Sequence, residues 1–394
     1  MFLKKRAHLA VVVLGLLVGF LGLSFAQERI ASPAQELDLR TFGFKLPTRT
    51  GHGTVGNLAE LFDDVRARVV FVDPRQLAVY FSDGTPEGPA GQPATRMEAF
   101  FVDTDARKLV SHEVWHTRKR RFFSERYDTQ ARIMPIAQGF LVHAENSLTA
   151  YSPSHAKIHE IELDPSQEWA AIVAPRGKTF FLEHSDPGVV TETNGVSFVQ
   201  QAGSLVAQGD WLDSATFERL RGVDIFPGMA MSVSDEGFVT RAKRCIDFQR
   251  VGAAPNHVCC GDPCGYGTPL FLEDGEVVSF YLSGFKLLST GGQVLWGRDA
   301  SDPQDHLIED CKHSLDGNRF AISIHWDRSA EFDHTRVPGR SRAIIVYDRS
   351  KRAKIFDVLI ESKDISEFAL SPDGRRLAIL IGTTLSVYGL PPAT

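Results

Sequence analysis

The chain has few cysteines, no excess of positive charge and only one long apolar run in 394 residues. Its five cysteines include no C-x-x-C pair, so a thioredoxin-like redox motif and a paired zinc knuckle are both missing. There is also no Gly-x-Ser-x-Gly elbow, phosphate-binding loop, dinucleotide fingerprint or haem attachment sequence. These absences argue against the enzyme classes that depend on such motifs.

The charge balance argues against a nucleic-acid partner. The formal net charge is -6 at pH 7, and loss of an N-terminal leader with its three cations, Lys4, Lys5 and Arg6, would leave -9. An acidic surface repels phosphate backbones. The basic run Arg118–Arg121 precedes two phenylalanines and could hold phosphate, but a solvated loop is the preferred interpretation.

Residues 1–26 have the pattern of a secretory signal peptide. A basic start is followed by an apolar run of 17 residues from Leu9 to Phe25, with small residues at Ser24 and Ala26. We expect cleavage after Ala26 and a secreted or periplasmic protein. An uncleaved membrane anchor is the alternative, because a spanning helix needs about 20 apolar residues. No other run in the chain is long enough to span a bilayer, so we expect no stable membrane span after cleavage.

Short repeated segments combine a turn with an apolar strand. Residues 372–381 (PDGRRLAILI) and 315–324 (LDGNRFAISI) share six of ten residues, and residues 72–81 and 175–184 are weaker copies. Asp, Gly and Pro close tight turns between antiparallel strands. The four copies begin 103, 140 and 57 residues apart, which fits two, three and one units of about 50 residues.

Seven such units fit the chain. The three remaining units are placed at 136–144, 232–241 and 271–282. A second set of segments reads as strand, polar turn, strand: residues 97–114, 147–163, 284–296 and 342–358. Helical signals are confined to 57–64 and 214–220. We therefore predict an all-β fold, a seven-bladed β-propeller of four-stranded antiparallel blades.

The turns resemble those of WD40-like propellers of exported bacterial proteins, including the periplasmic propeller of the Tol system. The mark of that family is SPDG before a short apolar strand, which Ser371–Gly374 matches fully and Ser314, Asp316 and Gly317 match in part. The chain departs from true WD40 repeats because Trp326-Asp327 follows a second strand rather than a third. The resemblance implies a propeller fold and carries no catalytic residues.

The last unit provides only three strands before the chain ends at Thr394, and an unclosed ring would expose strand edges. Segment Glu36–Leu46 alternates apolar and polar residues, so we predict that this N-terminal strand closes the ring. A disordered spacer over residues 27–60 is the alternative. The expected organisation is a signal peptide (1–26), a linker with the ring-closing strand (27–60) and the propeller (61–394).

Four cysteines, Cys245, Cys259, Cys260 and Cys264, lie within twenty residues in a segment rich in Gly and Pro. In an exported chain we expect two disulfides among them, each stabilising the fold by about 2–4 kcal/mol. Sequence leaves three pairings open, with the vicinal pair disfavoured by strain. Zinc bound with His257 and a redox role are the alternatives. Cys311 aligns with Phe368 and is predicted to be a buried, inert thiol.

The segment His112–His116 reads HEVWH and satisfies the H-E-x-x-H pattern of zinc metallopeptidases. That chemistry needs a helix, with Glu113 as the general base. Here the motif follows a hairpin turn and aligns with an outer strand, on which His112 and His116 would lie about 13 Å apart. One zinc ion, with zinc–nitrogen distances of about 2 Å, could not bind both.

We therefore predict an exported, non-catalytic propeller that binds an envelope or extracellular protein or a small ligand through loops on one face. No cofactor, metal or catalytic residue is expected, and we expect a monomer. Residues 82–95 and 329–342 are taken as the longest hairpin insertions and both join a second strand to a third. The alternative function is an extracytoplasmic hydrolase, including a zinc metallopeptidase that uses His112, Glu113 and His116.

Overall fold

A computed structural model describes most of the chain from residue 32 to residue 392. The described ranges are 32–46, 67–83, 94–118, 131–144, 146–164, 167–185, 189–193, 196–200, 207–225, 230, 232–242, 245–250, 252–258, 269–273, 275–281, 284–299, 307–326, 341–360 and 366–392. The predicted signal peptide and the possible helix at 57–64 lie outside them. Within these ranges no helix is long and apolar enough to cross a bilayer.

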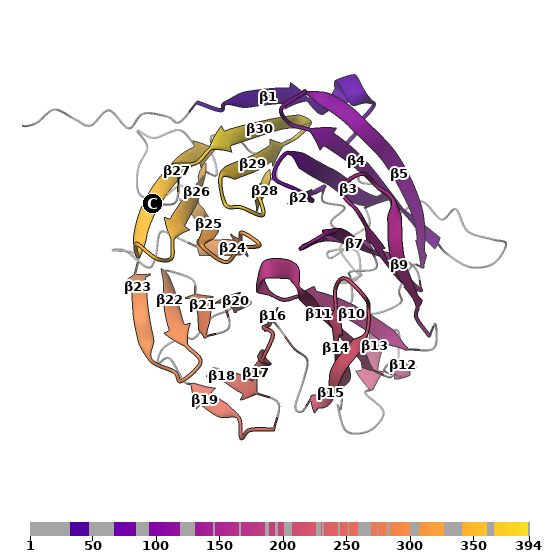
Figure 1. Cartoon of the computed structure of the whole chain (residues 1–394), viewed down its shortest axis with the longest axis vertical. Coiled ribbons are helices and arrows are strands. Elements are labelled where there is room, and N and C mark those ends of the chain that lie inside the picture. Colours follow the sequence, from indigo (N-terminus) through magenta and orange to yellow (C-terminus); the bar gives the residue numbers. More distant parts are fainter. Residues whose placement is uncertain are drawn as a thin grey trace, which may run out of the picture. The chain divides into compact units, whose positions relative to one another are not determined.

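Seven four-stranded antiparallel sheets stand in a ring, which confirms the predicted seven-bladed β-propeller (Figure 1). From the innermost strand outward, blade 1 contains β2 (Arg68–Phe71), β3 (Gln76–Asp83), β4 (Ala94–Asp103) and β5 (Lys108–Arg118). Blade 2 contains β6 (Ala131–Ile136), β7 (Gly139–Ala144), β8 (Ser147–Tyr151) and β9 (Lys157–Glu162). Blade 3 contains β10 (Glu168–Val173), β11 (Thr179–Ser185), β14 (Ala207–Asp213) and β15 (Arg219–Ile225).

Blades 4 to 7 follow the same order from the innermost strand outward. Blade 4 contains β16 (Ser232–Val233), β17 (Gly237–Ala242), β18 (Cys245–Arg250) and β19 (Asn256–Val258), and blade 5 contains β20 (Leu270–Glu273), β21 (Glu276–Tyr281), β22 (Gly284–Ser289) and β23 (Val294–Asp299). Blade 6 contains β24 (Leu307–His313), β25 (Arg319–Trp326), β26 (Ser341–Asp348) and β27 (Ala353–Ile360). Blade 7 contains β28 (Ser366–Leu370), β29 (Arg376–Ile381), β30 (Thr384–Gly389) and β1 (Gln35–Asp38).

All seven predicted turn-and-strand segments coincide with the second strand of a blade, from β3 to β29. The four predicted hairpins are the third and fourth strands of blades 1, 2, 5 and 6. The turn residues in the sequence predicted these strands correctly because each turn is held by hydrogen bonds among its own residues. In blade 7, the Ser371 hydroxyl donates to Asp373 Oδ1 (2.6 Å), and Gly374, at φ 65°, donates its N–H to the Ser371 carbonyl (2.8 Å).

Antiparallel order gives the ring two different faces. The connections from first to second and from third to fourth strand lie on one face, here called the turn face. The connections from second to third strand, and those between blades, lie on the opposite face, here called the loop face.

On the turn face, one backbone hydrogen bond recurs within the blades and joins their two turns. The residue after the third strand donates its N–H to the carbonyl of the residue before the second strand. The donor and acceptor pairs are Thr104 and Arg75, Ser214 and Lys178, Thr290 and Gly275, Arg349 and Asn318, and Leu390 and Arg375. These bonds satisfy polar groups that would otherwise be left open at the strand ends.

The first residue of the second strand links each of several blades to the next one. Arg319 is 1% exposed, and its Nη1 donates to the Gly374 carbonyl of blade 7 at 2.5 Å. Arg376 of blade 7 pairs with Asp105 of blade 1 at 2.7 Å, and Glu276 of blade 5 accepts from Arg349 of blade 6 at 3.0 Å. We call these side chains latches. The arginine shared by the two clearest repeats is therefore a contact between blades.

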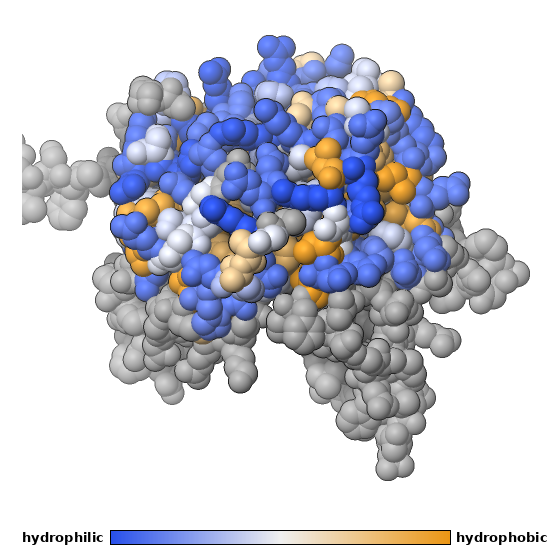
Figure 2. Space-filling model, turned by 60° about the horizontal axis from the view of Figure 1, so that its bottom comes forward, coloured by the Kyte–Doolittle hydropathy of each residue, from blue (hydrophilic) through white to orange (hydrophobic). Residues whose placement is uncertain are grey.

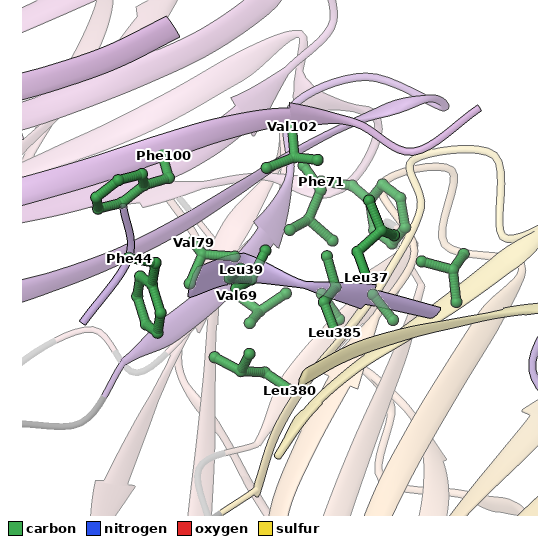
Figure 3. Close-up of a cluster of buried hydrophobic side chains, with 14 of the residues drawn as sticks. Leu37, Leu39, Phe44, Val69, Phe71, Val79, Phe100, Val102, Leu380 and Leu385 are labelled. Carbon is green, nitrogen blue, oxygen red and sulfur yellow. The ribbon is translucent and has the colours of Figure 1, made fainter. Parts of the chain in front are cut away.

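The ring closes through the N-terminal strand, as predicted. β1 lies along β30 and completes the blade that contains the chain's last strands, with Leu37 opposite Leu385 (Figure 1). Leu37, Leu39 and Phe44 then pack into a cluster shared by blades 7 and 1 (Figure 3). Phe44 meets the Phe100 ring edge to face, with centroids 5.5 Å apart.

The closing strand is shorter than predicted. β1 ends at Asp38, and residues Leu39–Phe42 form a 3-10 turn, η1, instead of continuing the strand to Leu46. The Asp38 side chain accepts a hydrogen bond from the Arg40 N–H (3.0 Å), and Gly43 ends the turn at φ 87°. This turn redirects the chain and lets Leu39 and Phe44 reach the cluster.

The helical turn expected at 214–220 is wrong. Ser214 follows β14 and begins a tight turn, and β15 begins at Arg219. The Asp213 carboxylate accepts from the N–H groups of Ala215 and Thr216, and Phe217 adopts φ 62°. A side chain that bonds the local backbone favours a turn over a helix.

Exposed apolar side chains are scattered on the described surface, which is mostly hydrophilic in the view of Figure 2. Apart from Leu46, which follows η1, they occur singly or in pairs on the outermost strands: Val110 and Val114 on β5, Ile158 on β9, Leu220 on β15, Val294 on β23 and Leu359 on β27. Single exposed apolar residues are normal on a folded protein and indicate no docking surface by themselves.

Ring closure can be tested with two leucine substitutions. Leu39 is fully buried in the closing cluster, so Leu39→Ala should lower the free energy of unfolding by about 3 kcal/mol through lost burial and a residual cavity. Leu46 is 47% exposed, and Leu46→Ala should change it by no more than about 0.5 kcal/mol. Urea titrations of both variants measure the difference. Equal small effects would show that the N-terminal segment does not close the ring.

Candidate functional site

The central channel is the natural place to look for a site in a propeller, and at the turn face a short segment crosses it. The 3-10 turn η2 (Pro175–Gly177) of blade 3 is the short coil inside the ring in Figure 1. The Arg176 N–H donates to the Leu315 carbonyl of blade 6 at 2.5 Å, and Gly177 accepts from the Ala137 N–H of blade 2 at 3.0 Å. Hence η2 joins blades from opposite sides of the ring.

The conformation of η2 requires a special sequence. Arg176 and Gly177 have φ values of 68° and 64°, in the left-handed region. A Cβ at Gly177 would lie 2.6 Å from the Ala137 nitrogen, so only glycine allows this approach. The Arg176 guanidinium also pairs with Glu273 of blade 5. The sequence signal for this segment, the weak repeat beginning at Pro175, indicated a turn but not its partners.

Charged side chains from the inner strands of several blades gather at the channel. Lys312 of β24 pairs with Glu367 of β28 and lies 3.6 Å from Asp310. Burial lowers the pKa of the Lys312 ammonium; Asp310 opposes this shift, while the positive charges of Arg68 and Arg132 reinforce it. Sequence reasoning missed this group, because its members lie on four different blades.

Cys311 and His313 flank Lys312 on β24. Cys311 pairs with Ile322 as Phe368 pairs with Ile379, and it is 5% exposed, so the predicted buried position is confirmed. Burial raises the pKa of the Cys311 thiol well above its ordinary value, which keeps it protonated and unreactive. Burial also lowers the pKa of His313, whose Nδ1 bonds the Ser314 carbonyl at 2.8 Å.

The HEVWH segment lies in β5, the outer strand of blade 1, as its alignment predicted. His112 is exposed, donates to Glu98 Oε1 (2.7 Å) and stacks on the Phe100 ring at 4.4 Å. Successive strand residues point to opposite faces, so Glu113 lies on the other face from His112. The helical arrangement that a zincin needs is therefore not formed. Among the residues with described side chains, no metal-binding group of three His, Cys, Asp or Glu is present.

The cysteine-rich segment is only partly described. Cys245 begins β18 and His257 lies in β19, so the described part of this segment supplies the outer half of blade 4. His257 Nδ1 bonds Asp247 across the strand pair. Cys259, Cys260 and Cys264 lie outside the described residues, and the predicted disulfides stay a prediction.

The two connections singled out in the sequence do join second strands to third strands, in blades 1 and 6, and so belong to the loop face. Their central residues, 84–93 and 327–340, lie outside the described part of the chain. Neither is the longest such connection, however. Residues 186–206 separate β11 from β14 in blade 3 and include an extra hairpin of β12 (Val189–Thr193) and β13 (Val196–Gln200).

One histidine is held between two blades. His155, in the turn before β9, bonds Ser111 of blade 1 through Nδ1 (3.1 Å) and meets the Phe101 ring edge to face at 4.3 Å. Its Nε2 is buried, and no hydrogen-bond partner lies among the residues that the structure describes. Burial lowers the pKa of His155, and Glu113 and Asp73 only partly oppose this shift.

Comparisons with known proteins add little to this geometry. No protein-family model matches the chain, and no curated protein sequence matches it. Among solved structures, a chain in the crystal structure of a mitotic checkpoint complex is similar, with a TM-score of 0.47 and 9% identity over 92% of this chain and 96% of that chain. A likeness at this level carries no argument about function, and the propeller assignment rests on the strand order itself.

The register of blade 4 leads to a prediction for one disulfide. Val258 pairs with Ile246, and extending this register by one position brings residue 259 opposite Cys245. Facing residues on antiparallel strands have Cα separations that a disulfide can bridge. We expect a Cys245–Cys259 peptide in non-reducing digests analysed by mass spectrometry, and its loss in Cys245→Ser. Cys311→Ala, at a buried free thiol, should leave it in place. A bond from Cys245 to another cysteine would contradict the prediction.

The half-buried imidazole of His155 predicts weaker folding in acid. Because its folded-state pKa lies below the ordinary value of 6.5, the unfolded chain binds the extra proton more readily. The contribution of His155 to stability is complete above pH 6.5 and falls as the pH drops towards the folded-state pKa. His155→Phe keeps a ring, and Phe217, at φ 62°, shows that phenylalanine accepts a φ close to the 65° of His155.

Urea titrations between pH 5 and pH 8 test this prediction. The difference in unfolding free energy between His155→Phe and the parent should shift in favour of the variant as the pH falls below 6.5. Parallel pH profiles for the two proteins would show that His155 titrates alike in the folded and unfolded states.

Proposed function

We propose that this chain is an exported, non-catalytic binding protein that holds a protein or small ligand on its loop face and acts as a monomer. The observation that carries this proposal is the asymmetry of the two faces. On the turn face η2 crosses the channel and binds blades on its far side. The longest strand connections all belong to the opposite face.

The lengths of these connections support a binding role. In blades 2, 4, 5 and 7 only two residues join the second strand to the third: 145–146, 243–244, 282–283 and 382–383. A four-stranded blade of this chain therefore forms without a long connection between its second and third strands. Residues 84–93, 186–206 and 327–340 exceed what the fold needs, and surplus surface loops on a rigid scaffold commonly bind ligands.

The charged channel group gives a ligand polar contacts behind those loops. Lys312, Arg68 and Arg132 supply three positive charges, and Asp310 and Glu367 supply two negative charges close by. A partner that inserts a polar or acidic side chain into the channel from the loop face would meet this group. Electrostatic complementarity of this kind favours specificity.

Export and family membership belong to the same proposal. The basic and apolar pattern of residues 1–26 supports a cleaved signal peptide and a periplasmic or secreted location. The Ser314 and Ser371 turns share the same serine-to-aspartate hydrogen bond, at 2.5 and 2.6 Å, which supports membership of the WD40-like exported propellers. We propose an envelope or extracellular partner on these grounds.

The proposal is tested by shortening two loops. Residues 84–95 and 327–340 are each replaced by Gly-Thr, the pair that joins β29 to β30 at Gly382 and Thr383. Both replacements keep the strand register, so each variant should be at least as stable as the parent, with a gain of up to about 2 kcal/mol from the shorter loop. Capture of partners from an envelope extract should fall several-fold.

Arg375→Gln is the matched control on the turn face, because the Arg375 side chain is 74% exposed there. It should capture the same partners as the parent. Undiminished capture by both loop variants, or loss of capture only with the turn-face variant, would refute binding through the loop face. Turnover of a substrate by the purified protein would refute the non-catalytic assignment.

A further inference from the structure

A cavity of about 280 Å³ lies between blades 4 and 5 at the turn face. Three buried aromatic rings line it, those of Phe238, Phe248 and Phe271. Its polar lining includes Glu236 and Arg250 of blade 4 and Thr290 of blade 5. It is therefore distinct from the channel and from the loop face.

The cavity lies where a latch is missing. The first residue of the second strand is an arginine or glutamate in blades 5, 6 and 7, and its side chain contacts the next blade. In blade 4 this residue is Gly237, which forms part of the cavity wall. A Cβ at Gly237 would lie 2.3 Å from the Gln249 carbonyl oxygen, so the backbone itself excludes a side chain there.

Two opposite charges border this apolar space. The Arg250 guanidinium donates through Nη2 to the Thr290 hydroxyl (3.1 Å), a neutral partner. The Glu236 backbone N–H bonds Ser234, and the charge of its carboxylate partly opposes the lowering of the Arg221 pKa by burial. Within the described part of the chain, neither Glu236 nor Arg250 belongs to an ion pair. Both charged groups are exposed, so solvent and a ligand can reach them.

We propose that this cavity binds a free apolar α-amino acid. The amino-acid side chain lies against the three phenylalanine rings, its carboxylate accepts from Arg250 and its ammonium donates to Glu236. A simple anion would meet the like charge of Glu236, and a simple cation would meet that of Arg250, whereas a zwitterion pairs with both. Pockets for drug-sized ligands begin at about 300 Å³, so this volume suits a smaller molecule.

Calorimetric titration of the full chain with L-phenylalanine tests the proposal. One saturable site per chain is expected. N-acetyl-L-phenylalanine lacks the ammonium and L-phenylalaninamide lacks the carboxylate, so each should bind at least about tenfold more weakly, the loss expected for one charged hydrogen bond. L-aspartate, with no apolar side chain, should not bind.

Two exposed substitutions locate the contacts. Arg250→Gln should weaken L-phenylalanine at least about tenfold but should not weaken L-phenylalaninamide, because the amide has no carboxylate to lose and is freed from the like charge of Arg250. Glu236→Gln should weaken L-phenylalanine likewise but should not weaken N-acetyl-L-phenylalanine, which has no ammonium to lose and is freed from the like charge of Glu236. Arg375→Gln, on the same face but in blade 7, should bind like the parent.

Several results would overturn the proposal. The first is the absence of saturable binding. The second is L-phenylalaninamide that binds as tightly as L-phenylalanine, which would indicate that the site takes a peptide N-terminus. The third is N-acetyl-L-phenylalanine that binds as tightly as L-phenylalanine, which would indicate that the site takes a peptide C-terminus. Unchanged affinity in both Arg250→Gln and Glu236→Gln would also overturn it. Circular dichroism melts of the variants distinguish these results from misfolding.

Discussion

The pairing of β1 with β30 is the constraint on which the rest of this ring depends. Blade 7 takes three strands from the end of the chain, and its fourth strand comes from residues 35–38. Without that strand, β30 would present unpaired backbone groups, and the cluster around Leu37 and Leu39 would face water. The contact joins residues more than 340 positions apart, so it links the two ends of the ring. Closure therefore makes the stability of each blade depend on the others.

The seams between blades depend on a second set of interactions, concentrated at the turn face. Arg319 is the clearest case, because its buried guanidinium donates to the carbonyl oxygens of Gly374 and Pro391. Such bonds from a charged donor contribute about 1.5–3 kcal/mol each. The Arg376–Asp105 pair is more exposed and contributes less, at most about 1 kcal/mol. The latch position thus stabilises different seams by different amounts, and at Gly237 it contributes no side chain.

Sequence patterns located the blades because their signals are local. A serine, an aspartate and a glycine within four residues hold the turn at 371–374 with hydrogen bonds among themselves. The closing strand was also found, since its alternation of apolar and polar residues is local. Its length was overestimated because the bond between Asp38 and the Arg40 N–H, which turns the chain, does not show in that alternation. The Cys311 position followed directly from alignment of two repeats.

The features that define the candidate sites are not local, and sequence reasoning missed them. The channel group draws Lys312, Glu367 and Arg132 from separate blades, and only the closed ring brings them together. The path of η2 across the channel depends on a bond between Arg176 and Leu315, which no turn signal specifies. The cavity lies beside Gly237, at the blade 4 position that has no latch. For the HEVWH segment, by contrast, alignment with the other repeats was enough to place it on the outer strand of blade 1.

Insertions on the turn face would lower the stability of the ring much more than insertions on the loop face. The loop-face connections can therefore change in length while the fold is kept. The turn face contains the backbone bonds between turns, the latches and η2, so a long insertion there would break contacts between blades. On the loop face, a connection lengthened from two to about fourteen residues costs about 2 kcal/mol of closure entropy. This cost is small beside the contacts retained at the seams. Insertions can therefore accumulate at residues 84–93, 186–206 and 327–340 without opening the ring. Binding specificity can change on the loop face as long as the opposite face keeps the blades in register.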